Sequence, residues 1–145
     1  MHYSSYDLCC AALCKDRHLF ANDLARYDLF IDPVRKVRNR NVYNLMAVAT
    51  AHLIGSLKLQ GIPMSGVPEM FGRINFNALA LAVDQFEVGQ IDTIIVAFLT
   101  FVPDEEDFTG VLTELSDISE VIATFGTCLI VDCSDFLKAK LEGFV

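Results

Sequence analysis

Six carboxylates follow the two most apolar stretches of the chain, 91–102 and 127–133, whose composition is typical of strands buried on both faces. If these strands are parallel neighbours, their carboxyl ends meet at one edge of a sheet, where open sheets bind ligands. Carboxylate oxygens suit Mg²⁺, so this edge is a candidate site for phosphoryl chemistry with Mg²⁺ as cofactor. In the competing interpretation the acidic loop simply stays hydrated and the next helical turn is capped. The carboxylates are Asp104, Glu105, Glu106, Asp107, Asp132 and Asp135.

A second candidate site lies near the N-terminus, where Cys10, Cys14 and His18 are spaced four residues apart. On a single helix they share one side and offer soft ligands to zinc or copper. Three ligands over two helical turns do not surround a tetrahedral ion, however, and cysteine is among the most buried residue types. We therefore interpret the five cysteines as reduced thiols and expect no metal cofactor, with a thiol or metal sensor as an alternative function.

The chain has one basic cluster, which could contact a phosphate or an acidic partner or could be a solvated connector between helices. Its members are Arg35, Lys36, Arg38 and Arg40. Through residue 40, seven basic and five acidic side chains give +2, whereas four basic and fourteen acidic ones after it give −10. A nucleic-acid ligand is therefore not expected, because phosphate-backbone binding needs a dense basic face. The acidic part favours a basic protein partner.

Catalytic and nucleotide-binding motifs are absent from the sequence. No glycine-rich dinucleotide fingerprint and no phosphate-binding loop of the Walker type is present. Ser65 lacks the glycine frame of a nucleophile elbow, and His52 lies within an apolar segment where a hydrogen-bonded core histidine is the usual finding. We assign no catalytic residue and favour a protein that is not an enzyme.

The elements that must position these residues follow from the apolar periodicity and the capping residues. Ser4 and Asp7 predict a capping box at the start of one long amphipathic helix that ends at Asp32-Pro33. The other predicted helices span 42–60, 77–88, 109–125 and a short segment from 134. With the two strands they predict a single domain, 1–145, of class α/β or α+β. Its helix-rich N-terminal half packs on a small, partly parallel sheet that contains a βαβ unit with strands 91–102 and 127–133.

Composition leads to the functional hypothesis. The chain of 145 residues is 53% hydrophobic with a mean hydropathy of +0.41, and a domain of this size buries only ~70% of its unfolded surface. We therefore expect the protein to self-associate, with a dimer favoured, and to bind a protein partner or small ligand. Because the sequence shows no signal peptide and no membrane span, we expect a cytoplasmic protein. Immunity, counter-defence or regulatory adaptor proteins are of this type. The alternative is a small α/β enzyme that uses Mg²⁺ on the strand-end carboxylates.

Overall fold

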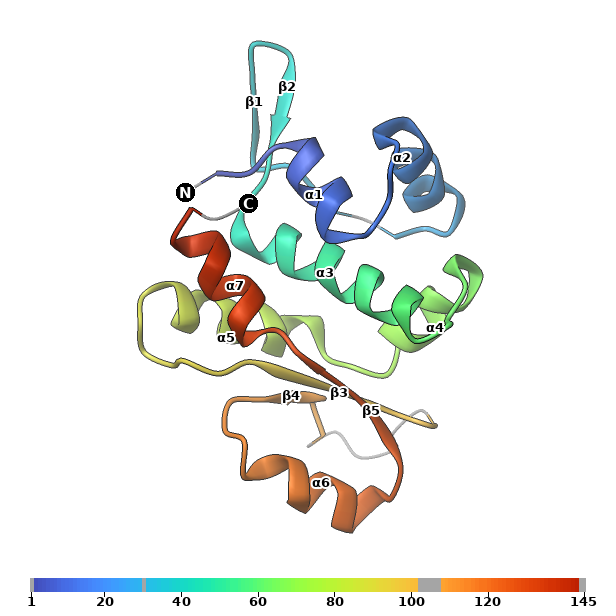
Figure 1. Ribbon diagram of the computed structural model, residues 1–145, viewed down its shortest axis with the longest axis vertical. Coiled ribbons are helices and arrows are strands. Elements are labelled where there is room, and N and C mark those ends of the chain that lie inside the picture. Colours follow the sequence, from blue (N-terminus) through green and yellow to red (C-terminus); the bar gives the residue numbers. More distant parts are fainter. Residues whose placement is uncertain (1, 30, 102–107, 144–145) are drawn as a thin grey trace. The chain divides into compact units, whose positions relative to one another are not determined.

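The computed structural model describes residues 2–29, 31–101 and 108–143 (Figure 1). The chain forms two compact units, Met1–Pro68 and Glu69–Val145. Helices and two small antiparallel sheets are mixed along the chain, so the fold class is α+β, the second of the two predicted classes. The predicted single domain stays a prediction, and each unit is described by itself.

In the described part of the first unit, two helices are followed by a β-hairpin, a third helix and a 3₁₀ turn. α1 (Ser5–Ala11) begins with the predicted capping box: the Ser4 hydroxyl accepts from the Asp7 N–H at 3.2 Å, and the Asp7 carboxylate accepts from the Ser4 N–H at 2.8 Å. The remaining elements are α2 (Arg17–Arg26), β1 (Arg35–Val37), β2 (Arg40–Val42), α3 (Leu45–Leu59) and the 3₁₀ turn η1 (Met64–Gly66).

The single long helix predicted from Tyr6 to Ile31 is wrong. α1 ends at Ala11, because Leu13 adopts a left-handed conformation (φ 56°) that closes the last turn. Asp16 then starts α2 by accepting the backbone N–H groups of His18 and Leu19 at 2.8 and 3.3 Å. The apolar spacing is compatible with one helix, but these local caps divide it into two.

α3 is the central helix of the first unit, and ten of its fifteen residues are buried. It begins one turn later than predicted, because Asn44 rather than Asn41 caps it, accepting the Ala47 N–H at 3.0 Å. Its end at the predicted Gly61 is confirmed, with a left-handed φ of 86°. α1 packs against α3, where the Lys58 ammonium donates to the Ala12 carbonyl at 3.2 Å. This pair of helices supports the hairpin described below.

The second unit combines helices with a three-stranded antiparallel sheet of order β4-β3-β5. The central strand β3 is fully buried. On one face of the sheet, Ala97 and Leu99 form a core cluster with Val121 of α6. The elements are α5 (Phe76–Glu87), β3 (Ile95–Leu99), β4 (Val111–Leu112), α6 (Asp117–Phe125), β5 (Cys128–Asp132) and α7 (Ser134–Leu141), with α4 (Val67–Phe71) at the boundary of the two units.

The predicted parallel sheet with a βαβ unit is wrong. Both predicted strands exist within their predicted ranges, but β3 and β5 are antiparallel neighbours, with Ile95 opposite Asp132 and Leu99 opposite Cys128. The sequence interpretation missed β4, a two-residue strand that was assigned to a helix and that pairs with β3 through Val96 and Val111. β4 and β5 lie on either side of β3, and both are antiparallel to it, so they run in the same direction as each other. The connection through α6 therefore joins β4 to β5 and not β3 to β5.

Candidate functional site

The basic cluster forms a β-hairpin in the first unit rather than an irregular connector (Figure 1). Val37 pairs with Arg40, so the turn consists of Arg38 and Asn39, and both have positive φ (52° and 65°). A two-residue turn with positive φ at both positions matches the right-handed twist of the strands. Asparagine tolerates this conformation, whereas a left-handed arginine is uncommon. Asn39, a residue type that tolerates positive φ, between Val37 and Val42 was the available sequence signal.

The hairpin brings all four predicted basic residues together on an exposed element. Arg35 lies opposite Val42, and Lys36 lies opposite Asn41, so the cations extend from both faces of the two strands. Each of these four side chains is exposed, and none forms an ion pair within the part of the chain that the structure describes. Since a guanidinium presents a fork of donors that matches carboxylate and phosphate geometry, the element is suited to anionic groups. The four residues are Arg35, Lys36, Arg38 and Arg40.

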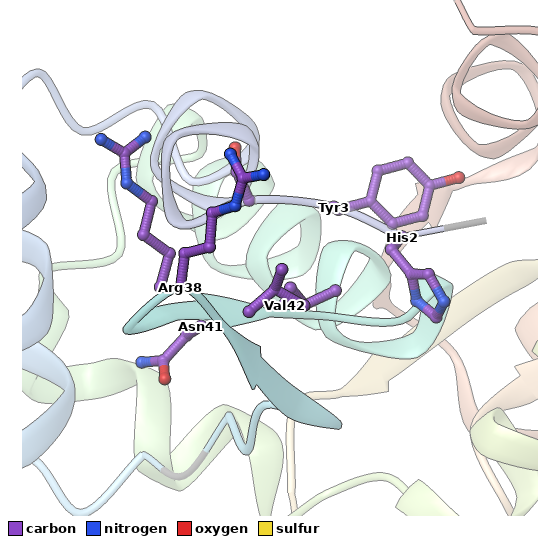
Figure 2. A pocket seen from close by; sticks show the side chains of 8 residues that line it. His2, Tyr3, Arg38, Asn41 and Val42 are labelled. Carbon is purple, nitrogen blue, oxygen red and sulfur yellow. The ribbon is translucent and has the colours of Figure 1, made fainter.

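A cavity of about 650 Å³ opens beside this hairpin. Tyr3 attaches the N-terminal segment to the base of the hairpin through hydrogen bonds of 2.9 and 2.8 Å with the backbone of Tyr43. Figure 2 shows His2 and Tyr3 toward one end of the cavity and Arg38 toward the other. The full lining is His2, Tyr3, Ser4, Val37, Arg38, Arg40, Asn41 and Val42. The cavity therefore combines apolar walls with two guanidinium groups.

Asn41 is the one polar side chain of the hairpin strands with an unsatisfied buried atom in the described structure. Its amide nitrogen donates to the Tyr43 hydroxyl at 3.5 Å, while its Oδ1 atom is buried and has no partner. A buried acceptor without a donor costs ~1–3 kcal/mol. The hairpin thus carries a local energetic penalty that a ligand or partner with a donor group would relieve.

The two described carboxylates of the predicted metal site lie in the second unit. Asp132 pairs with Ile95, the first residue of β3. The acidic residues 104–107 follow the other end of β3, Leu99, in the sequence, so Asp132 lies at the opposite end of the strand. The parallel arrangement that was to bring them together is therefore wrong. Asp132 Oδ1 accepts the Ser134 N–H at 2.9 Å, so this carboxylate binds a backbone donor at the start of α7, whose N-cap residue is Cys133. Asp135 lies in the first turn of α7, and Asp104, Glu105, Glu106 and Asp107 lie outside the described residues.

The predicted soft-metal residues are divided between two helices. Cys10 belongs to α1, Cys14 to the connecting segment and His18 to the first turn of α2, so the expected single helical face is wrong. All three still line one cavity of about 570 Å³. Over the described ranges, no group of three or more histidine, cysteine or carboxylate side chains is arranged to hold a metal ion.

A second exposed surface, which the sequence interpretation missed, lies on α6 of the second unit. Leu115, just before the helix, is 64% exposed, and Ile122, two turns further on, is 49% exposed. Two acidic residues of the same segment, Glu114 and Glu120, are also exposed, although Glu120 lies two positions before Ile122 and therefore on a different side of the helix. We call these four residues the α6 surface. It combines apolar and acidic character, whereas the hairpin combines apolar and basic character.

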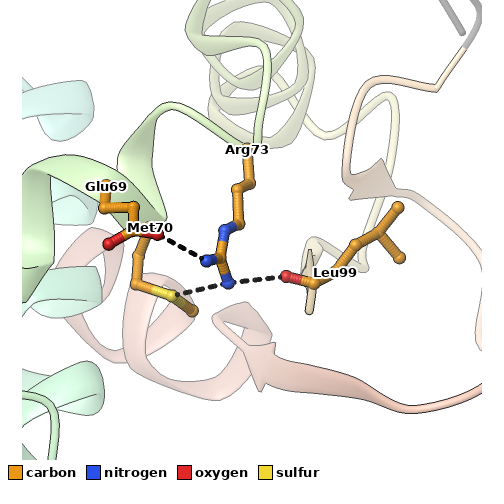
Figure 3. A network of polar contacts seen from close by, with 4 residues as sticks. All are labelled: Glu69, Met70, Arg73 and Leu99. Carbon is orange, nitrogen blue, oxygen red and sulfur yellow. Dashed lines mark hydrogen bonds and ion pairs between the residues drawn. The ribbon is translucent and has the colours of Figure 1, made fainter. Parts of the chain in front are cut away.

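The second unit also contains a partly buried arginine whose contacts are internal (Figure 3). Arg73 Nη1 donates to the Leu99 carbonyl at 2.9 Å and lies 3.3 Å from the Met70 sulfur, and Nη2 pairs with the Glu69 carboxylate at 3.0 Å. The Nε atom is buried and has no partner among the described residues. Because the guanidinium binds the last carbonyl of β3, we assign Arg73 to the stability of the sheet rather than to ligand binding.

Comparisons with known proteins do not identify a family. No protein-family model, no curated protein and no solved structure matches the chain. No helix in the described ranges is both long enough and apolar enough to span a bilayer.

Proposed function

We propose that the chain is a non-enzymatic interaction protein that self-associates, and that the basic hairpin of one copy binds the α6 surface of a second copy. The observation that carries the proposal is the match between these two surfaces. The hairpin presents Arg38 and Arg40, which have no ion-pair partner in the described structure, and the α6 surface presents Glu114 and Glu120. Opposite charges on two exposed elements favour encounter and fix the register of association.

The distribution of charge between the units supports association of unlike surfaces. The first unit has eight basic and five acidic residues, which give +3, and the second has three basic and fourteen acidic residues, which give −11. The first unit of one copy and the second unit of another therefore carry opposite net charges, and where these units approach within a Debye length their attraction opposes the repulsion between two chains of net charge −8. A pair of unit charges at 4 Å contributes ~1 kcal/mol in water and ~4 kcal/mol at an effective dielectric constant of 20.

The apolar content of the two surfaces supports the same pairing. Val34 and Val37 of the hairpin segment are 48% and 45% exposed, comparable to the exposed fractions of Leu115 (64%) and Ile122 (49%). Burial of apolar surface contributes ~25 cal/mol per Å². A contact between the two surfaces therefore buries apolar groups as well as charged ones.

The experiment is sedimentation velocity on the full chain at low and high salt. The test variant is Arg38→Glu/Arg40→Glu, and its matched control is Lys15→Glu/Arg26→Glu, which makes the same change in net charge at exposed sites of the same unit outside the hairpin. The rescue variant combines the test substitutions with Glu114→Arg/Glu120→Arg.

We expect a dimer at low salt whose dissociation constant rises with salt, because exposed charge pairs are screened. The test variant should weaken the dimer at least ~10-fold, equivalent to ~1.4 kcal/mol, the control much less, and the rescue variant should restore most of the affinity. A monomer at low salt at the highest soluble concentration, an equal loss in the control, or a failed rescue would each overturn the proposal.

A further inference from the structure

The last turn of α1 brings two cysteine residues together. The N–H groups of Leu13 and Cys14 donate to the carbonyls of Cys10 and Cys9 at 3.1 and 3.0 Å. With the left-handed Leu13 between them, these are the two hydrogen bonds of a Schellman motif. In this motif the side chains at the two ends of the longer bond usually meet in an apolar contact. In α1 those side chains are Cys9 and Cys14.

The other helices of the first unit show what normally occupies these two positions. At the end of α2, the Leu29 N–H donates to the Leu24 carbonyl at 2.8 Å, around the left-handed Asp28. At the end of α3, the Ile62 N–H donates to the Leu57 carbonyl at 3.0 Å, around Gly61. Both pairs are aliphatic. The same backbone motif in α1 therefore holds two thiols where its neighbours hold hydrocarbon side chains.

The geometry of the α1 pair permits a disulfide. The 3.0 Å bond from the Cys14 nitrogen to the Cys9 oxygen limits their Cα separation to about 7 Å at most, given standard backbone dimensions, and disulfides span ~4.4–6.8 Å. The Cys9 Sγ atom itself lies 2.8 Å from the Cys14 carbonyl oxygen. Both residues are in the reduced state in the structure.

The two thiols differ in their access to solvent. Cys9 is only 3% exposed, and burial, followed by the neighbouring Cys14 thiol, raises its pKa. Cys14 is partly exposed and lines the cavity of about 570 Å³ described above. Cys9 lines the same cavity but is far less exposed, so a soluble reagent reaches Cys14 more readily than Cys9.

We propose that Cys9 and Cys14 are a redox-active dithiol, a modification site that low-molecular-weight disulfides such as glutathione disulfide oxidise reversibly. The Cys14 thiolate attacks one sulfur of glutathione disulfide, which forms a mixed disulfide and releases one glutathione as its thiolate. The Cys9 sulfur, deprotonated by solvent, then attacks the Cys14 sulfur and releases the second glutathione. The protein loses two electrons and two protons, and glutathione disulfide gains them as two thiols.

The resulting disulfide locks the end of α1. It joins the two ends of a turn whose central residue, Leu13, occupies a left-handed position that glycine fills in α3. The same turn includes Ala12, whose carbonyl accepts from Lys58 of α3 at 3.2 Å. Oxidation therefore stabilises the turn through which α1 contacts α3, and reduction releases it. This inference is independent of the proposed self-association.

The experiment equilibrates the full chain in glutathione buffers of graded redox ratio, quenches with acid, alkylates with N-ethylmaleimide and maps the tryptic peptides. No lysine or arginine precedes Lys15, so one peptide contains Cys9, Cys10 and Cys14. Cys10→Ser is the matched control, because Cys10 is the adjacent exposed thiol of the same helix. Cys14→Ser removes the proposed attacking thiol from a partly exposed position, and the wild-type peptide gives the result even if a variant fails to fold.

In oxidising buffer we expect the wild-type peptide to carry one maleimide, on Cys10, so that its mass is lower than that of the fully alkylated dithiol peptide by two maleimide groups and two hydrogen atoms. Cys10→Ser should retain the disulfide, Cys14→Ser should lose it, and oxidised Cys10→Ser should melt at a higher temperature than its reduced form. Three maleimides in oxidising buffer, a maleimide or a persistent glutathione adduct on Cys9 or Cys14, or an unchanged or lower melting temperature would overturn the proposal.

Discussion

The close approach of α1 and α3 makes a sharp prediction for Gly55. A methyl group at this position would overlap the Ala11 carbonyl oxygen and lie 3.1 and 3.2 Å from the carbonyl carbon and Cα of Ala12. These are backbone atoms, which cannot rotate away as the end of a side chain can. The overlap with the Ala11 oxygen is the tightest of the three, and since carbon and oxygen in C–H···O contacts lie ~3.3–3.6 Å apart, α1 would have to retreat by roughly 1 Å.

The expected sign of the Gly55→Ala effect is opposite to that of a solvent-exposed helix position. Alanine gains ~1 kcal/mol over glycine from helix propensity. Overpacking of a buried contact costs ~1–3 kcal/mol, and the retreat of α1 also stretches the 3.2 Å hydrogen bond from Lys58 to Ala12. We therefore expect Gly55→Ala to lower the free energy of unfolding by ~1–2 kcal/mol.

Urea denaturation followed by far-ultraviolet circular dichroism measures this difference from the shift in midpoint at constant slope. Ser56→Ala is the control, because it changes the adjacent, less buried position of the same helix and should alter stability by less than ~0.5 kcal/mol. A Gly55→Ala protein as stable as the wild type, with an unchanged slope, would refute the close contact between α1 and α3.

Two further predictions concern side chains outside the proposed surfaces. Arg73→Met should lower the free energy of unfolding by ~1.5–3 kcal/mol in urea denaturation, because the Leu99 carbonyl loses its charged donor. Glu69→Gln, at the 72% exposed end of the ion pair, should lower it by less than ~1 kcal/mol. Equal effects of the two substitutions would contradict the role of the hydrogen bond to Leu99. Burial lowers the pKa of His52 below its usual 6.5, so the stabilising contribution of the neutral imidazole is complete above pH 6.5 and is lost as the pH falls through the lowered value. Denaturation at a series of pH values should therefore show a smaller acid-side loss in His52→Gln than in the wild type, and parallel profiles would contradict this.

The basic residues illustrate how far the sequence predicted the candidate site. Their clustering was evident, because Arg35, Lys36, Arg38 and Arg40 are near neighbours in the chain. The hairpin that presents them was not predicted, because its turn lacks the glycine that usually marks such turns and instead places Arg38 in a left-handed conformation. The α6 surface was missed for a different reason: an amphipathic pattern predicts one buried face and says nothing about apolar residues that stay exposed.

Features that depend on residues close together in the chain were determined by the sequence itself. The Ser4–Asp7 capping box, the end of α3 at Gly61 and the existence of both buried strands follow from side chains that act on their own neighbours. Strand direction was decided only by the tertiary structure. The apolar composition of β3 and β5 is the same for parallel and antiparallel pairing, and the pairing depended on a two-residue strand, β4, that is too short to give a periodic signal. The direction of β5, and with it the separation of Asp132 from the end of β3, follows from the pairing of residues 29 to 37 positions apart in the sequence.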